Sequence, residues 1–299
     1  MMNEMMDETM DETTDREKLL LFDVDGTIAE SGKQISRAME TLLLDISRKY
    51  RIGIVGGGKL EKILWQTRET LVFDHYFTEC GCVYHTPISS PSTNLYAKDF
   101  IPASALWSPR GIHSFLSKLR EKKSKSPREL QHIYTKNLRE HALYPKINIL
   151  VKTALEFLSR VDFMITGNFI DLRNGIIYIS LVGMSATEEE REAYIKLDEE
   201  HNYRSRLIDV LMSKARSLEI DNGIQICEGG HVGIAIYPIE YDKEQVMEVL
   251  LDKDDVEIHY FGDKYQPNGN DHRLINNPNV IGHPVDSIDD TIEILKKMA

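Results

Sequence analysis

Three aspartates stand where two buried strands are expected to end. Asp23 and Asp25 interrupt the apolar run that begins at 19–22, and Asp263 follows the run at 258–262. Parallel sheets bind ligands beyond the carboxyl ends of their strands, so we expect the three side chains to converge there. Adjacent carboxylates repel one another unless a hard cation joins them, and Mg²⁺ prefers a few carboxylates together with water and phosphate oxygens. The pattern therefore predicts a magnesium site that handles a phosphoryl group.

The residues around these aspartates are expected to form a parallel sheet. Residues 19–27 are typical of a buried strand, 34–50 of an amphipathic helix, and 51–58 of a second strand that ends in glycines. A strand, a helix and a strand at this spacing favour a βαβ unit. The same pattern of alternating strands and helices returns after Pro238, with a helix, two strands and a final helix.

The middle of the chain predicts an antiparallel module instead. Asn174-Gly175 is the usual turn pair of a two-residue hairpin, and Gly229-Gly230 takes the same place in a second hairpin. A long helix between the hairpins opens at Thr187 with the pattern of a capping box. We therefore expect an α/β protein in which a second domain is inserted into the first. The expected ranges are 19–86 and 239–299 for the core and 87–238 for the inserted cap.

Composition narrows the class of protein. The chain has 299 residues and a net charge of -12, which argues against nucleic acid as a partner. No apolar run approaches the ~20 residues of a membrane span, and the start lacks the features of a signal peptide, so we expect a cytoplasmic protein without a membrane partner.

Two segments of the chain have an unusual composition. Residues 1–18 hold seven acids and two bases, which predicts a disordered tail. Residues 87–130 are rich in proline, serine and lysine, which predicts an insertion or mobile loop. The three cysteines have no metal or disulfide spacing, and we expect buried thiols.

The order of motifs resembles that of the haloacid dehalogenase superfamily. Asp-x-Asp-Gly-Thr at 23–27 is followed by a glycine turn, by Lys243, by Gly-Asp and by Asn-Asp. The resemblance implies that Asp23 is the nucleophile that takes up a phosphoryl group and that Asp25 is the general acid/base. These roles suit phosphoryl transfer, in which positioning and charge neutralisation carry most of the catalysis.

The same resemblance implies further roles around the predicted metal. Lys243 would neutralise the phosphoaspartate, although a solvated surface lysine is the alternative. Asn270 and Asp271 either belong to the metal site or brace its loop through hydrogen bonds, as Asx-rich turns do. The candidate Mg²⁺ ligands are Asp23, Asp25, Asp263 and Asp271.

Longer stretches resemble one branch of this superfamily. FDVDGT, IGIVGGG, FIDLRNG, EEEREAYIKLDEE, YDK and YFGDKYQPNGNDH follow the order and spacing of the eukaryotic phosphomannomutases. The resemblance implies a haloacid-dehalogenase-like parallel-sheet core with an inserted α+β cap built on an antiparallel sheet. It also implies a phosphohexomutase that uses Mg²⁺, interconverts mannose 6-phosphate and mannose 1-phosphate through a hexose bisphosphate, supplies GDP-mannose synthesis, and forms a homodimer through the cap.

The departures from this family lie in the substrate site. Arg173 is retained, whereas Thr166 and Met184 stand where the family has phosphate-binding arginines. Gly32 replaces a third arginine, and Gly233 and Ala235 replace a serine and an aspartate. The candidate substrate-binding residues are Arg173, Lys33, His231 and Gly57. Because the cap is depleted, a sugar-phosphate phosphatase of the same fold and a catalytically weak binding or regulatory homologue are the alternatives to a mutase.

Overall fold

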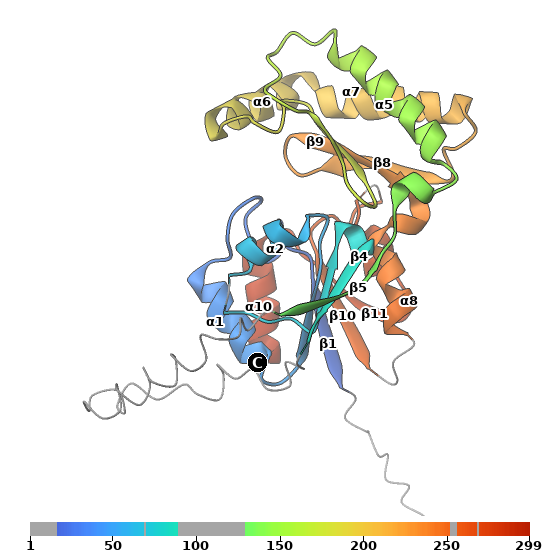
Figure 1. The fold of residues 1–299 in the computed structure, drawn as a ribbon. Helices are drawn as coiled ribbons and strands as arrows, with labels where there is room; N and C mark the ends of the chain where they lie inside the picture. The colour runs from blue at the N-terminus through green and yellow to red at the C-terminus, as the bar shows by residue number, and fades with distance from the viewer. Residues whose placement is uncertain (1–16, 69, 89–128, 252–255, 268) are drawn as a thin grey trace, which may run out of the picture.

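The computed structural model describes residues 17–68, 70–88, 129–251, 256–267 and 269–299, which form a core sheet and a cap sheet with their helices (Figure 1). The tail expected at 1–18 lies outside these residues except for its last two positions, and Lys18 already begins the first strand. Residues 89–128 of the expected insertion also lie outside them. None of the described helices combines the length and apolar composition that a membrane span requires.

The core sheet has seven strands in the order β11-β10-β1-β2-β3-β4-β5. The strands from β11 to β3 are parallel, whereas β4 is antiparallel to β3 and β5 is antiparallel to β4. The predicted parallel sheet is thus confirmed, with two antiparallel strands added at one edge. The strands are β1 (Lys18–Phe22), β2 (Arg51–Val55), β3 (His75–Thr78), β4 (Val83–Pro87), β5 (Leu130–Thr135), β10 (Glu257–Gly262) and β11 (Val280–Pro284).

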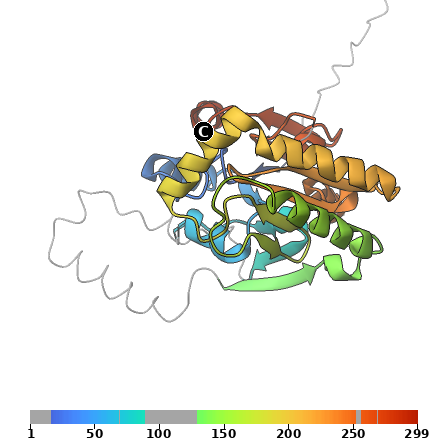
Figure 2. The same ribbon diagram turned by 90° about the horizontal axis from the view of Figure 1, so that it is seen from above.

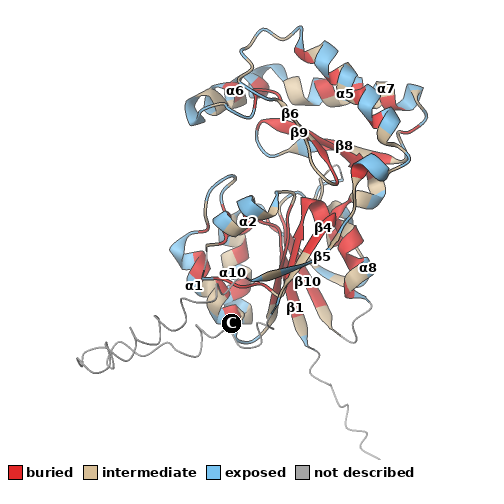
Figure 3. Ribbon diagram, in the orientation of Figure 1, coloured by how far each residue is buried: buried red, intermediate tan, exposed pale blue. Residues whose placement is uncertain are grey.

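Helices cover both faces of this sheet, and burial is densest along its central strands (Figure 3). Leu20 and Phe22 pack on the face of α1 (Arg37–Ile46), α2 (Leu60–Gln66) and α10 (Ile288–Met298). Leu19 and Leu21 point to the other face, which is covered by α8 (Met247–Leu250) and α9 (His272–Ile275). The alternation of strand side chains explains why every position of 19–22 is apolar. Two 3-10 helices, η1 (Glu79–Gly81) and η5 (Lys243–Val246), complete the core near the cap.

The cap is a four-stranded antiparallel sheet with helices on one face (Figures 1 and 2). Its strand order is β6-β7-β9-β8, and the two hairpins predicted from the sequence are present. The cap follows the short 3-10 helix η3 (Leu138–Glu140), and its bare sheet face is turned toward the core. The cap elements are α5 (Tyr144–Leu158), β6 (Ile170–Leu172), β7 (Ile177–Ser180), α6 (Glu188–His201), α7 (Tyr203–Ser217), β8 (Ile224–Gly229) and β9 (Gly233–Pro238), and η4 (Ile239–Tyr241) leads back to the core.

Three details differ from the sequence prediction. The range expected for the cap, 87–238, includes β5, but β5 pairs with β4 in the core sheet. The expected long helix is capped at Thr187 as predicted, yet it divides into α6 and α7 at Asn202, which has a φ of 54°. Asparagine adopts this left-handed conformation more readily than most residues, and the break follows from it. Both hairpins also have loops longer than two residues, because Leu172 pairs with Ile177 and Gly229 pairs with Gly233.

Candidate active site

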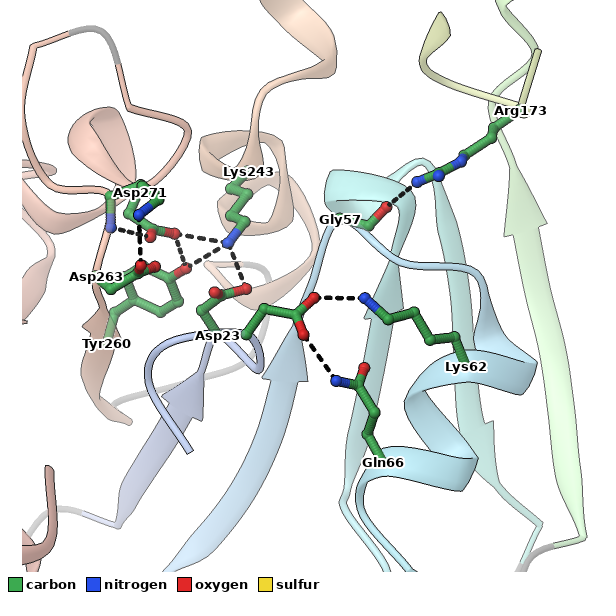
Figure 4. Close-up of polar contacts among 11 residues, drawn as sticks. Asp23, Gly57, Lys62, Gln66, Arg173, Lys243, Tyr260, Asp263 and Asp271 are labelled. Atoms are coloured by element: carbon green, nitrogen blue, oxygen red, sulfur yellow. Dashed lines mark hydrogen bonds and ion pairs between the residues drawn. The ribbon is translucent and has the colours of Figure 1, made fainter. Parts of the chain in front are cut away.

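Three carboxylates converge beyond the ends of the two central strands. Asp23 follows β1 and Asp263 follows β10, and the parallel register places Phe22 beside Phe261. Asp271 precedes α9 and turns back toward them. One oxygen of each carboxylate lies within 4.8 Å of the other two (Figure 4). Three of the four candidate Mg²⁺ ligands thus lie together in the described structure.

Lys243 lies inside this acidic group. Its side chain is fully buried, and its Nζ lies 2.7 Å from Asp23 Oδ1 and 2.6 Å from Asp271 Oδ1 (Figure 4). Tyr260 Oη is a third neighbour at 3.2 Å and also hydrogen-bonds Asp271. A solvated surface lysine is thereby excluded. Burial opposes the charge of this lysine, but Asp23 and Asp271 outweigh it and hold the pKa of Lys243 well above its usual range.

The remaining negative charge of the group suits a cation. Burial raises the pKa of Asp23 to about 7, Lys243 opposes this, and Asp271 and Asp263 add to it. Asp263 Oδ2 pairs with Lys264, whereas its Oδ1 is buried and has no hydrogen-bond partner within the described part of the chain. An orphaned carboxylate oxygen beside two further carboxylates is the donor set that Mg²⁺ prefers. Asp23, Asp263 and Asp271 therefore fit the predicted metal.

Asp25 lies apart from this group. Its carboxylate is bound by Lys62 Nζ at 2.6 Å, Gln66 Nε2 at 2.7 Å and the Gly32 amide at 2.8 Å. Burial works against its charge, but the contacts with Lys62, Gly32 and Gln66 lower the pKa of Asp25 below its usual value. Among the described residues the acidic group does not include this carboxylate, so the structure does not place it as the fourth metal ligand. The physical reason is the pair of donors on α2, which draws it to the other side of the turn.

Sequence reasoning missed Lys62, Gln66 and Tyr260. Lys62 and Gln66 are four residues apart on α2, and this spacing places them on one helix face. This spacing was a usable signal, but no sequence pattern indicates which residues that helix face meets. Tyr260 sits in the apolar strand β10 and carries no local sign of its contact with Lys243.

The four candidate substrate-binding residues fall into two groups. Arg173 Nη1 donates to the Gly57 carbonyl at 3.0 Å, so the cap and the core meet at these two residues (Figure 4). Lys33 is instead paired with Glu30 at 2.7 Å on the surface. His231 is exposed in the turn between β8 and β9.

Thr166 and Met184 occupy two adjoining loops at the far end of the cap hairpin. The Thr166 amide donates to the Val182 carbonyl, and the Met184 amide donates to Asn168. The Thr166 hydroxyl is buried without a hydrogen-bond partner in the described structure, and Met184 is 38% exposed. Neither side chain offers a cation at this place.

Comparison with known proteins agrees with this architecture. The structure is similar to that of an IMP-bound, N-terminally truncated IMP-nucleotidase from Plasmodium falciparum, with a TM-score of 0.54, 12% identity and coverage of 95% of this chain and 68% of that one. A haloacid dehalogenase-like hydrolase from Bacteroides thetaiotaomicron gives a TM-score of 0.50 at 14% identity and covers 95% of this chain and 100% of its own. The predicted haloacid-dehalogenase-like fold with an inserted cap is confirmed.

Sequence relatives identify the branch. The profile described as eukaryotic phosphomannomutase matches residues 112–299. A phosphomannomutase from Dendrobium officinale is 30% identical over 281 residues, which are 93% of this chain and 92% of the relative. The phosphomannomutase of Saccharomyces cerevisiae is 29% identical over 285 residues and 94% of each chain. This chain belongs to the eukaryotic phosphomannomutase family.

Proposed function

We propose that the protein is a phosphohexomutase that interconverts mannose 6-phosphate and mannose 1-phosphate through a phosphoaspartate at Asp23. The observation that carries the proposal is the buried contact between Asp23 and Lys243, at the end of the central strand and inside the acidic group. Relatives that match more than 90% of both chains are phosphomannomutases, which supports the choice of reaction.

The proposed chemistry starts from the Asp23 oxygen that already contacts Lys243. Lys243 binds Asp23 Oδ1, so the other oxygen, Oδ2, is the one that attacks the phosphorus of a hexose bisphosphate. The bond between phosphorus and the bridging oxygen breaks, and Asp25 gives the departing sugar oxygen the proton that it took up as a base in the preceding half-reaction. In the half-reaction that forms the bisphosphate, Asp25 takes the proton of the free 6-hydroxyl of mannose 1-phosphate, whose oxygen attacks the phosphorus of the phosphoaspartate and releases the Asp23 carboxylate.

The residues divide the charge of this reaction between them. Lys243 remains beside Asp23 throughout and offsets the charge of the phosphorylated carboxylate. Asp25 must exchange its contacts with Lys62 and Gln66 for the sugar oxygen, so these two residues hold the proton-transfer group ready beside the nucleophile. When bound by Asp23, Asp263 and Asp271, Mg²⁺ would add positive charge next to the phosphate oxygens.

The test follows two products in one assay. The protein is incubated with mannose 1-phosphate, Mg²⁺ and a hexose 1,6-bisphosphate, and mannose 6-phosphate and free phosphate are measured together. We expect isomerisation by the parent and its loss in Asp23→Asn, because an amide cannot form the acyl phosphate. Free phosphate without isomer would identify a phosphatase, and wild-type turnover by Asp23→Asn would refute the assignment of the nucleophile.

Four finer points belong to the same proposal. We infer Mg²⁺ as the cofactor, since the acidic group offers hard oxygen ligands. The protein would act in the cytoplasm and supply GDP-mannose synthesis, as the family resemblance implies. It would form a homodimer through the cap, and exposed apolar side chains on the cap helices support this: Ile149, Leu155, Leu197 and Val210.

A further inference from the structure

Tyr178 stands on the face of the cap sheet that is turned toward the core. Its neighbours on β7, Ile177 and Ile179, are buried under the cap helices, so alternation directs Tyr178 to the opposite face. Tyr178 pairs with Ala235 of the neighbouring strand β9, and its Oη donates to the Gly229 carbonyl at 3.0 Å. Both ends of the phenol ring are therefore fixed to the cap sheet.

Two glycines make room for this ring. A Cβ at Gly233 would lie 2.6 Å from Tyr178 Cζ, and a Cβ at Gly229 would lie 2.8 Å from Cε2. A side chain at either position would have to displace the ring. Glycine weakens a strand interior and often marks a site where another group approaches closely, as it does here. The ring thus lies against a floor of bare backbone.

The guanidinium of Arg173 lies over the same ring. Its Cζ is 4.9 Å from the ring centroid, within the range of a cation–π interaction. Asp171 Oδ2 accepts from Arg173 Nε at 2.8 Å, and Gly57 accepts from Nη1 at 3.0 Å. These three contacts fix the plane of the guanidinium. Within the described part of the chain, Asp171 and Gly57 are the acceptors that contact this guanidinium, so its remaining N–H groups can bind a phosphate.

The surroundings place this arrangement beside the reaction centre. Gly57, which Arg173 contacts, belongs to the loop that follows β2 at the same edge of the core sheet.

We propose that Tyr178 is a positioning residue for Arg173 and sets the reach of the cap toward the distal phosphate of a hexose phosphate. This inference rests on the proposed function for the identity of the substrate. The ring holds the guanidinium above the backbone of the two glycines. Because Thr166 and Met184 stand where the family has arginines, phosphate binding by the cap depends on Arg173. A substrate too small to reach from Asp23 to the cap does not use Tyr178.

The experiment compares a hexose phosphate with a small phosphoryl donor. Steady-state kinetics are measured with mannose 1-phosphate and with acetyl phosphate, which phosphorylates Asp23 and releases acetate before water hydrolyses the phosphoaspartate. We expect Tyr178→Leu to raise KM for mannose 1-phosphate about tenfold and to leave acetyl phosphate turnover unchanged, because an aligned charge-assisted contact to phosphate is lost. Tyr178→Phe keeps the ring face and is expected to behave as the parent.

A second cap tyrosine provides the matched control. Tyr203 also lies under an arginine, with Arg206 Cζ 5.6 Å from its ring centroid, but it packs against Phe163 on the helical side of the cap. Tyr203→Leu is expected to leave KM for both substrates unchanged. The Nε–Hε resonance of Arg173, assigned with Arg173→Lys and recorded by ¹⁵N NMR without substrate, should carry a ring-current shift that Tyr178→Leu abolishes.

The outcomes separate this inference from the proposed function. If Tyr178→Leu slows both substrates equally, or leaves the Arg173 resonance unchanged, Tyr178 does not position Arg173. If the resonance shifts as expected while the parent turns over no mannose 1-phosphate, the positioning stands and the proposed function is wrong.

Discussion

Replacing Lys243 with methionine tests the electrostatics of the acidic group directly. The change keeps an unbranched side chain but removes the ammonium that lies 2.7 Å from Asp23 and 2.6 Å from Asp271. Lys243 and Asp271 are fully buried, so water cannot replace the lost contact without rearrangement. Removal of one partner from a buried ion pair costs about 3–5 kcal/mol. We expect the free energy of unfolding to fall by about that amount in EDTA, which is a large part of the roughly 5–15 kcal/mol typical of a folded domain.

The assay is urea unfolding followed by circular dichroism, with the parent and the variant at the same pH. Lys136→Met is the matched control, because Lys136 pairs with Glu248 at 3.0 Å on the surface, where such a pair contributes about 1 kcal/mol or less. Adding Asp271→Asn to Lys243→Met should recover part of the loss, since one uncompensated charge disappears. A loss no larger than that of Lys136→Met would show that the ammonium does not offset buried carboxylates, and the reasoning would fail.

Two other perturbations address the metal and the histidine pair. Mg²⁺ at 100 times its Kd should stabilise the parent by about 2.7 kcal/mol, which raises Tm by about 5–10 °C. Asp263→Ala should abolish this rise in Tm, because Asp263 Oδ1 lacks another partner in the described structure. Equal shifts in Tm in both proteins would contradict the proposed metal site. Burial and the neighbouring His259 lower the pKa of His283 to about 4, so its neutral form stabilises the fold above pH 6.5 and this contribution is lost as the pH falls toward 4. His259 Nδ1 and His283 Nε2 lie 2.8 Å apart, and His259 also contacts Glu257. The shift sets an upper limit of about 3 kcal/mol, which screening of this partly exposed ring reduces to about 1–2 kcal/mol. His283→Gln should therefore lose less stability between pH 7 and pH 4.5 in urea unfolding, and parallel losses would count against this interpretation.

The sequence predicted those features whose cause is local. The apolar run before Asp23 specifies a strand buried on both faces, and Thr187 specifies a helix start through its capping box, which the structure contains. The position of β5 is a different matter, because it depends on pairing with a strand more than 40 residues earlier in the chain. A left-handed Asn202 was equally hard to predict, since the helical pattern continues on both sides of it.

The site shows the same division between local and distant causes. That Asp23 and Asp263 meet follows from parallel pairing of the strands before them, which hydrophobic pattern predicts. Which way Asp25 points depends on Lys62 and Gln66, which lie about 40 residues further along the chain. The residue types predict that Asp25 lies at the end of the strand. Its partners come from α2, and no local pattern predicts where that helix packs.

The turn after β1 explains how two carboxylates that are two residues apart can take the two different roles that we propose for them. Gly26 has a φ of +91°, and a Cβ there would lie 2.7 Å from Asp263 Cγ, so glycine is required both by the backbone and by the approach of the metal-site carboxylate. The turn leaves Asp23 against Lys243 and directs Asp25 toward Lys62. A carboxylate enclosed with a buried cation is suited to hold a phosphoryl group, whereas one held by a half-exposed lysine can exchange a proton with the sugar. The two proposed roles therefore depend on the geometry of one glycine turn, and a side chain at Gly26 would disturb the proposed nucleophile, the proposed proton donor and the acidic group together.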